Sequence, residues 1–167
     1  HTQSLCIRSQ RRIDLSTLIL EQAPARDNIA IIESPLLIGV DIFLASHQNI
    51  RRLCTDMHII KQYQWQRCQL RVEELAINLP SETDNHISLN ELQPFIDACV
   101  NLTSLTCSDS NLICNDGFQF QKISSLYFIC CNFTGSFLDL LVSDNARNVN
   151  SIVFEGVDCN GPFSSSL

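Results

Sequence analysis

Cysteine and histidine are the side chains most able to do chemistry here, because a thiol beside an imidazole can act as a nucleophile. Cys54 and His58 lie four residues apart, a spacing that would bring them to one face of a helix. The apolar pattern around Cys54, described below, instead predicts a strand. His86 and Asp84 fall in the polar stretch 80–86, whose composition is that of a connecting loop. We therefore expect neither pair to be catalytic.

Sequence motifs of enzymes and metal sites are absent. The chain contains no G-x-S-x-G, no Walker-type loop and no H-E-x-x-H. Its nine cysteines are spread over the whole length and none forms C-x-x-C, so neither a zinc site nor a thioredoxin-type centre is indicated. We expect a protein that is not an enzyme and that uses no metal and no cofactor.

The cysteines and two glycosylation sequons leave the cellular compartment open between two interpretations. Unpaired cysteine packs as a small hydrophobic residue, which favours buried free thiols and an intracellular protein, cytoplasmic or nuclear. The sequons Asn101-Leu102-Thr103 and Asn132-Phe133-Thr134 would require secretion if they were used. The alternative is therefore a secreted receptor ectodomain with disulfides and N-glycans.

Composition and charge indicate a folded domain and argue against a membrane-spanning or nucleic-acid-binding protein. The chain has 167 residues, 45% of them hydrophobic and 17% charged, which is the balance of a folded domain. Its longest apolar stretch, 29–45, is interrupted by Glu33, Pro35 and Asp41, so no transmembrane helix is expected. Residues 73–167 hold two basic and twelve acidic side chains. Because this half would repel phosphate, a nucleic-acid partner is not expected.

A short block with apolar residues at its first, fourth and sixth positions recurs along the chain. The fourth and sixth positions follow the two-residue period of a strand, which places them on one face. We expect one strand of a parallel sheet in each block. The predicted strand blocks are 15–20, 50–55, 72–77, 102–107, 123–128 and 149–154.

Helical spacing replaces this pattern between the blocks. Apolar residues from Leu36 to Leu44 predict a helix with Ser34 as its cap and Pro35 in its first turn. A second helix is expected to start near Pro94, and a short third one after Ser136. The segment 108–122 is turn-like and too cramped for much helix. Such helices are the crossovers that parallel strands need.

The blocks and the junctions before them resemble the leucine-rich repeat family, whose motif is L-x-x-L-x-L-x-x-N/C-x-L. From Ile123 the motif is kept through Cys131 and Phe133, whereas other copies replace the Asn or Cys with Ser110, His58, Pro80 and Val157. The segments 43–53 and 95–105 are similar to the helix-to-strand junctions of intracellular repeats, including those of F-box substrate receptors. The resemblance implies an α/β solenoid with a parallel β-sheet on the concave side and helices and loops on the convex side. We expect residues 1–167 to form a single domain of about six irregular repeats, as part of a larger protein.

The residues between the apolar positions would line the strand face of such a sheet. Arg51 and Arg52 would then lie beside Glu73 and Glu74 of the next strand, where opposite charges attract. Mutual neutralisation on a solvated surface is one interpretation, and a charged anchor for a partner is the other. Tyr127 has the amphipathic ring that is favoured at binding hot spots. The predicted partner-binding residues are Arg51, Arg52, Glu73, Glu74, Ser104, Thr106, Ser125 and Tyr127.

These observations together predict a protein–protein interaction module. It would bind another protein through the strand face, as the recognition part of a ubiquitin-ligase receptor or of another adaptor. The last block ends at Phe154, close to the end of the sequence. A repeat end without a cap exposes apolar surface, so we also expect edge-to-edge association.

Overall fold

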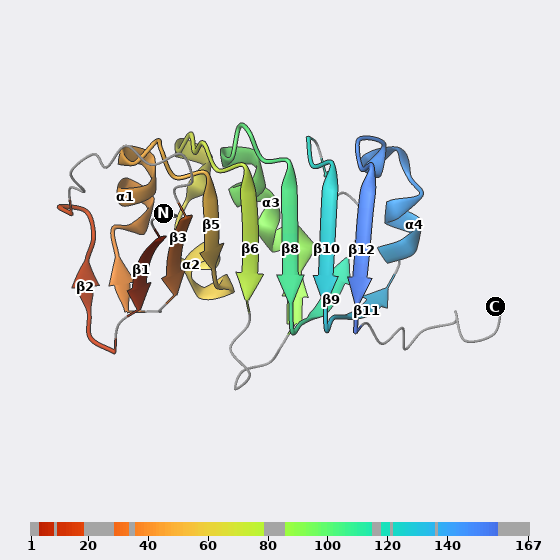
Figure 1. The fold of residues 1–167 in the computed structure, drawn as a ribbon, viewed down its shortest axis with the longest axis horizontal. Helices are drawn as coiled ribbons and strands as arrows, with labels where there is room; N and C mark the ends of the chain where they lie inside the picture. Colours follow the sequence, from red (N-terminus) through yellow and green to blue (C-terminus); the bar gives the residue numbers. More distant parts are fainter. Residues whose placement is uncertain are drawn as a thin grey trace.

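The computed structural model describes residues 4–8, 10–18, 29–33, 36–78, 86–114, 118–120, 122–135 and 137–156. In this part of the chain, seven parallel strands lie side by side in one sheet, and the helices α1–α4 lie together behind it (Figure 1). The strands, in spatial order, are β1 (Ser4–Arg8), β3 (Ile29–Glu33), β5 (Arg52–Thr55), β6 (Glu74–Asn78), β8 (Ser104–Ser108), β10 (Ser125–Ile129) and β12 (Ser151–Glu155). The α/β class and the parallel sheet are confirmed.

The register of the sheet follows the apolar blocks. The fourth block positions of five successive strands are paired with one another, and they are Leu53, Leu75, Leu105, Leu126 and Ile152. Leu105 and Leu126 are fully buried beneath the helices. Each of these five strands begins two residues into its block, and the first apolar residues of four blocks, Ile50, Val72, Leu102 and Ile123, are buried. The five predicted strand blocks 50–55, 72–77, 102–107, 123–128 and 149–154 are therefore confirmed.

The block 15–20 is the exception, and its prediction as a strand of the main sheet is wrong. Leu15 is buried, but residues 15–18 form a turn closed by a 3.0 Å hydrogen bond from the N–H of Leu18 to the carbonyl of Leu15. Leu18 is 39% exposed, and residues 19 and 20 lie outside the described part. The strands β1 and β3 occupy this end of the sheet instead: Ala30 and Ile32 of β3 are fully buried, and Leu5 and Ile7 of β1 pack partly buried against the core.

The segment before this turn belongs to a small second sheet. Its two strands, β2 (Ile13–Asp14) and β4 (Leu37–Ile38), pair in parallel. Helix α1 (Val40–Ser46) follows β4 after Gly39, which adopts a left-handed φ of 68°. The expected start of this helix near Pro35 is wrong, since Leu37 pairs as a strand residue. Ser34 and Pro35 lie outside the described residues.

Of the two other predicted helices, one begins earlier than expected and one forms as expected. Helix α3 (Leu89–Ala98) starts a full turn before Pro94, which lies inside it. Burial of Leu89 and Leu92, both fully buried, outweighs the helical hydrogen bond that proline cannot make. Helix α4 (Phe137–Leu141) forms where it was predicted. Three further helical segments were not predicted, namely α2 (Met57–Gln62), η1 (Trp65–Arg67) and η2 (Asp144–Ala146).

A third, three-stranded sheet occupies the ends of the central units. It contains β7 (His86–Ser88), β9 (Asn111–Cys114) and β11 (Asn132–Gly135), paired in parallel. The expected turn-like segment 108–122 therefore includes a strand. This three-stranded sheet gives each central unit a second point of contact with the next.

The core between the main sheet and the helices includes the buried aromatic residues Trp65, Phe95 and Phe128.

Candidate binding face of the sheet

The surface of the main sheet that points away from the helices is the candidate site, and we call it the outer face. Its side chains alternate with the buried apolar ones along each strand, as the two-residue period requires. One row consists of Arg52, Glu74, Ser104, Ser125 and Ser151, and the next of Cys6, Ile31, Cys54, Ala76, Thr106, Tyr127 and Val153. Six of the eight predicted site residues stand in these two rows, while Arg51 and Glu73 precede the strands at their starting ends.

The four predicted charges form two ion pairs. Arg51 Nη1 lies 2.7 Å from Glu73 Oε1, and Arg52 Nε lies 2.9 Å from Glu74 Oε2. The predicted attraction between neighbouring strands is thus confirmed. All four side chains are between 37% and 49% exposed, so each pair contributes about 0–1 kcal/mol to stability. At β5 and β6, therefore, these charges neutralise one another on an exposed surface, and their role as an anchor for a partner stays a prediction.

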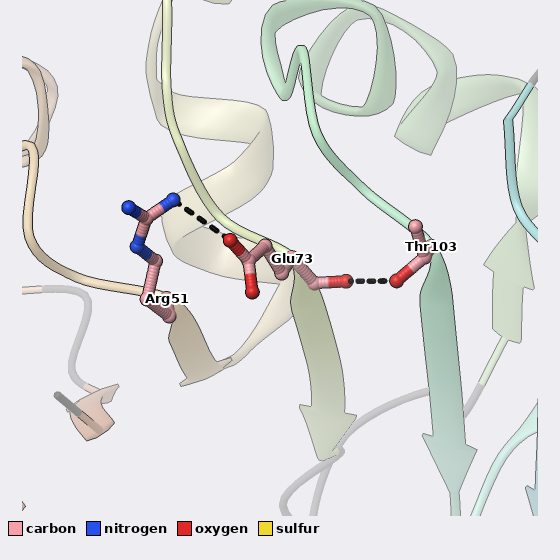
Figure 2. A network of polar contacts seen from close by, with 3 residues as sticks. All are labelled: Arg51, Glu73 and Thr103. Carbon is pink, nitrogen blue, oxygen red and sulfur yellow. Dashed lines mark hydrogen bonds and ion pairs between the residues drawn. The ribbon is translucent and has the colours of Figure 1, made fainter. Parts of the chain in front are cut away.

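Glu73 also belongs to a repeated backbone pattern, which we call the head ladder, and Figure 2 shows the contact of the Thr103 hydroxyl with its carbonyl. Its carbonyl accepts the N–H of Thr103 at 2.9 Å and that of Ser104 at 3.1 Å, and the Thr103 hydroxyl donates to it at 3.3 Å. The carbonyls of Arg51, Thr103 and Ser124 each accept two N–H groups from the next strand in the same way. The head ladder sets the spacing at which the outer-face side chains are presented.

A shallow hollow of about 380 Å³ opens beside the head ladder. It is lined by Glu73, Val100, Asn101, Thr103 and Lys122. Lys122 donates from Nζ to the carbonyl of Val100 at 3.1 Å, so the lining of the hollow includes both an ammonium group and the Glu73 carboxylate. Lys122 was not among the predicted site residues, because it precedes a strand block by one residue and carries no pattern of its own.

The character of the outer face changes from β5 to β12. Beyond the ion pairs come half-buried hydroxyls, Ser104, Thr106 and Ser125. Tyr127 follows, 36% exposed, with Thr106 and Val153 as its register neighbours. Charged, hydroxyl and apolar surfaces thus succeed one another along a single row of strands.

The thiol of Cys54 contacts polar groups on the neighbouring strands. It lies 3.1 Å from Asn78 Nδ2, which donates to the sulfur, and 3.6 Å from Glu33 Oε1. Cys54 is on strand β5, as predicted, whereas His58 is an exposed residue of helix α2. Among the described residues, no group of three or more His, Cys, Asp or Glu side chains is arranged to hold a metal ion. His86 lies in β7, and Asp84 lies outside the described part.

The position where the repeat motif has Asn or Cys is buried in two successive units. Ser110 and Cys131 occupy it, with Oγ and Sγ 3.5 Å apart, and the Cys131 thiol donates to the Cys107 carbonyl at 3.2 Å. His58 does not take this position, because Asp56 caps a helix there instead. Pro80 and Val157 lie outside the described residues.

The cysteines described by the structure include both exposed and buried thiols. Cys6 and Cys130 are exposed, whereas Cys99, Cys107 and Cys131 are buried. Burial raises the pKa of the Cys99 and Cys107 thiols far above their ordinary value, because a thiolate there would lose its hydration. Cys159 lies outside the described part.

The two sequons differ in their surroundings. Asn101 is exposed at the rim of the hollow. Asn132 is half-buried in β11 and donates from Nδ2 to Asn111 Oδ1 at 2.9 Å. A glycan on the half-buried Asn132 would be attached to an amide nitrogen that already bonds another unit, whereas Asn101 is exposed.

Comparisons with models of protein families, with curated proteins and with solved structures found no match. Within the described part of the chain, no helix has the length and apolar character that crossing a membrane requires.

Proposed function

We propose that this protein is a leucine-rich repeat module that binds another protein through the outer face. The observation that carries the proposal is the continuous, laterally ordered surface of strands with helices on the opposite side (Figure 1). The regular register of the blocks and the repeated head ladder support the assignment to a repeat solenoid. Binding, rather than catalysis, is the activity that such a surface favours.

The graded outer face suggests how a partner would be held. Tyr127 and Val153 offer an apolar contact, and the hydroxyls between them and the ion pairs offer hydrogen bonds to a polypeptide. Arg52 and Glu74, each paired with the other, can re-pair with charges of the partner at little cost because both are about half exposed. This use suits the recognition part of an adaptor, including a ubiquitin-ligase receptor.

We further propose an intracellular setting, cytoplasmic or nuclear. The burial of Cys99, Cys107 and Cys131 as thiols supports a reducing environment, since cysteine-rich secreted proteins usually pair their cysteines. The half-burial of Asn132 beside Asn111 suits a glycan less well than an exposed position would, which favours the intracellular setting over a glycan at that position. Intact mass and thiol titration of the native protein would distinguish the two.

The outer face is tested with a double variant, Arg52→Ala with Tyr127→Ala, used as bait in affinity capture from source cells. Capture of proteins that bind wild type should fall at least about tenfold, because two contact residues at a binding surface together contribute well over 1 kcal/mol. A matched double variant on the helix side, Arg67→Ala with Val142→Ala, should capture them normally; both residues are exposed there. Unchanged capture by a folded outer-face variant would count against the proposal.

A further inference from the structure

The hollow beside the head ladder is lined by one ammonium group, that of Lys122. Its Nζ donates to the carbonyl of Val100 at 3.1 Å, which holds the group in place. An ammonium group has three N–H donors, and this bond uses one of them. In the described part of the chain, no carboxylate lies within ion-pair distance of Lys122. The hollow therefore presents a positioned positive charge that can donate two further hydrogen bonds.

The one carboxylate of the lining is already neutralised. Glu73 Oε1 lies 2.7 Å from Arg51 Nη1, as Figure 2 shows. The two cations and the one anion at this corner of the molecule together leave a single positive charge. An anionic group is therefore attracted to the hollow, whereas a cation is not.

The other lining residues suit a carboxylate on a short apolar stem. Asn101 is exposed, and its carboxamide N–H groups can donate to a carboxylate oxygen. Val100 is 40% exposed and offers a small apolar surface beside the ammonium group. A phosphate group would bring almost two negative charges to one unbalanced cation. The lining thus matches the carboxylate and methylene groups of a glutamate side chain better than a phosphate.

The place of the hollow connects it to the outer face. Glu73 and Thr103 in its lining directly precede Glu74 and Ser104, which belong to the first row of that face. A polypeptide lying on this row therefore reaches the hollow with a side chain. Residues 73–167 carry twelve acidic side chains and two basic ones, so a strongly acidic segment would be repelled around the hollow.

We propose that the hollow binds one glutamate side chain of the partner, within a segment that is otherwise uncharged or basic. Lys122 pairs with the carboxylate, Asn101 donates a hydrogen bond to it, and Val100 contacts its methylene groups. The inference rests on the proposed function, because it names the part of the partner that the outer face brings to the hollow.

The test is a nuclear magnetic resonance titration of the full ¹⁵N-labelled chain with the blocked peptide acetyl-Gly-Glu-Gly-amide. The amide signals of Asn101, Thr103 and Lys122 should shift. The Gln peptide acetyl-Gly-Gln-Gly-amide should bind about fivefold more weakly, because it lacks the charge that pairs with Lys122. The variant Lys122→Gln should weaken binding of the Glu peptide by a similar factor. Arg147→Gln is the matched control, since it removes the other basic side chain of residues 73–167, which is also exposed, and it should bind as wild type does.

The variant Glu73→Gln gives a change in the opposite direction. It releases Arg51 from its ion pair and should strengthen binding of the Glu peptide about twofold. Weaker binding would show instead that the hollow needs its own carboxylate, as a site for a zwitterion does, and would refute the proposal. Equal binding of the Glu and Gln peptides, or equal effects of Lys122→Gln and Arg147→Gln, would refute it as well.

The role of the hollow in partner binding is measured separately. Among captured proteins that depend on Arg52 and Tyr127, capture should fall with Lys122→Gln and stay unchanged with Arg147→Gln. Equal capture by these two variants would exclude the hollow from the interface while leaving the outer face as the binding surface. Loss of the outer face as a binding surface would appear only in the Arg52→Ala, Tyr127→Ala experiment, so the two failures are distinguishable.

Discussion

Asp56 is the charged residue that is buried in the described part of the chain. It is buried at the start of helix α2, where its Oδ1 accepts the N–H of Ile59 at 3.0 Å. Burial raises the pKa of the Asp56 carboxyl, and the negative Glu33 raises it further, although the hydrogen bond from Ile59 acts in the opposite direction. The cap needs an oxygen acceptor at this position, but it does not need a negative charge.

Replacing Asp56 separates these two roles. Asp56→Asn keeps an acceptor for Ile59 and removes the buried charge, so it should stabilise the protein at neutral pH. Asp56→Ala removes the cap and should have a free energy of unfolding about 1 kcal/mol below that of Asp56→Asn. Urea unfolding followed by the fluorescence of Trp65, the single tryptophan, measures both.

The difference in stability between Asp56→Asn and wild type should depend on pH in a direction that the pKa shift predicts. Because the folded-state pKa of Asp56 lies above the ordinary 3.8, the folded chain binds this proton more tightly than the unfolded one. The associated stability is present below pH 3.8 and is lost as pH rises through the raised pKa. The free energy of unfolding of Asp56→Asn, relative to that of wild type, should therefore grow as pH rises from 3.8 through the raised pKa. A difference that shrinks as pH rises would contradict the raised pKa of Asp56.

Gly39 shows how one residue determines where an element begins. It links β4 to helix α1 with φ of 68°, and a Cβ there would lie 2.7 Å from the Cβ of Ser16. The conformation and the close approach both require glycine. The small sheet of β2 and β4 and the first turn of α1 consequently depend on this position.

The variant Gly39→Ala should lower the free energy of unfolding by at least about 1–2 kcal/mol, the cost of the left-handed conformation, with the clash in addition. Gly156→Ala is the matched control, because φ there is similar but Asp109 and Cys130 hold the equivalent conformation with side chains present. Gly156→Ala should lower the free energy of unfolding by less than Gly39→Ala does. Equal losses in urea unfolding would show that close packing against Ser16 is unimportant.

The elements that sequence predicts well are those whose apolar pattern repeats. Five strands and the Arg–Glu pairing between neighbours follow from the blocks alone, whereas β3, with Ile29, Ala30, Ile31 and Ile32 in a continuous apolar run, has no two-residue alternation to reveal it. Helix α2 is too short for a periodic stripe, although Asp56 as its cap was a usable signal. The hollow at Lys122 depends on tertiary contacts between units, which no local pattern contains.

Among the described strands, each central strand of the main sheet has a neighbour on both sides, whereas β12 has one neighbour, β10. Equivalent positions in successive units therefore differ in burial: Leu126 is fully buried, and its neighbour Ile152 is 39% exposed. Stability should fall off along the row toward β12, since burial of apolar surface is the main favourable contribution to folding.

Replacing Leu126 and Ile152 with alanine, one at a time, measures this fall in stability toward β12. Leu126→Ala should destabilise the protein by about 3 kcal/mol, because it leaves a cavity that its neighbours cannot fill. Ile152→Ala should cost about 1 kcal/mol, in proportion to its smaller buried area. Both are compared by urea unfolding at low protein concentration, where the expected edge-to-edge association does not contribute. Equal costs would indicate that the β12 end is covered in solution.

The head ladder has a consequence for how proteins of this design change in length. Each rung joins a strand only to its successor, and the residues at two successive rungs, Thr103-Ser104-Leu105 and Ser124-Ser125-Leu126, are nearly the same. Excising residues 104–124 would join Thr103 to Ser125. The carbonyl of Glu73 would then accept the N–H groups of Thr103 and Ser125 in place of those of Thr103 and Ser104. A gene for such a chain can therefore lose or duplicate a whole unit in one event while the junction that remains is already compatible with the fold.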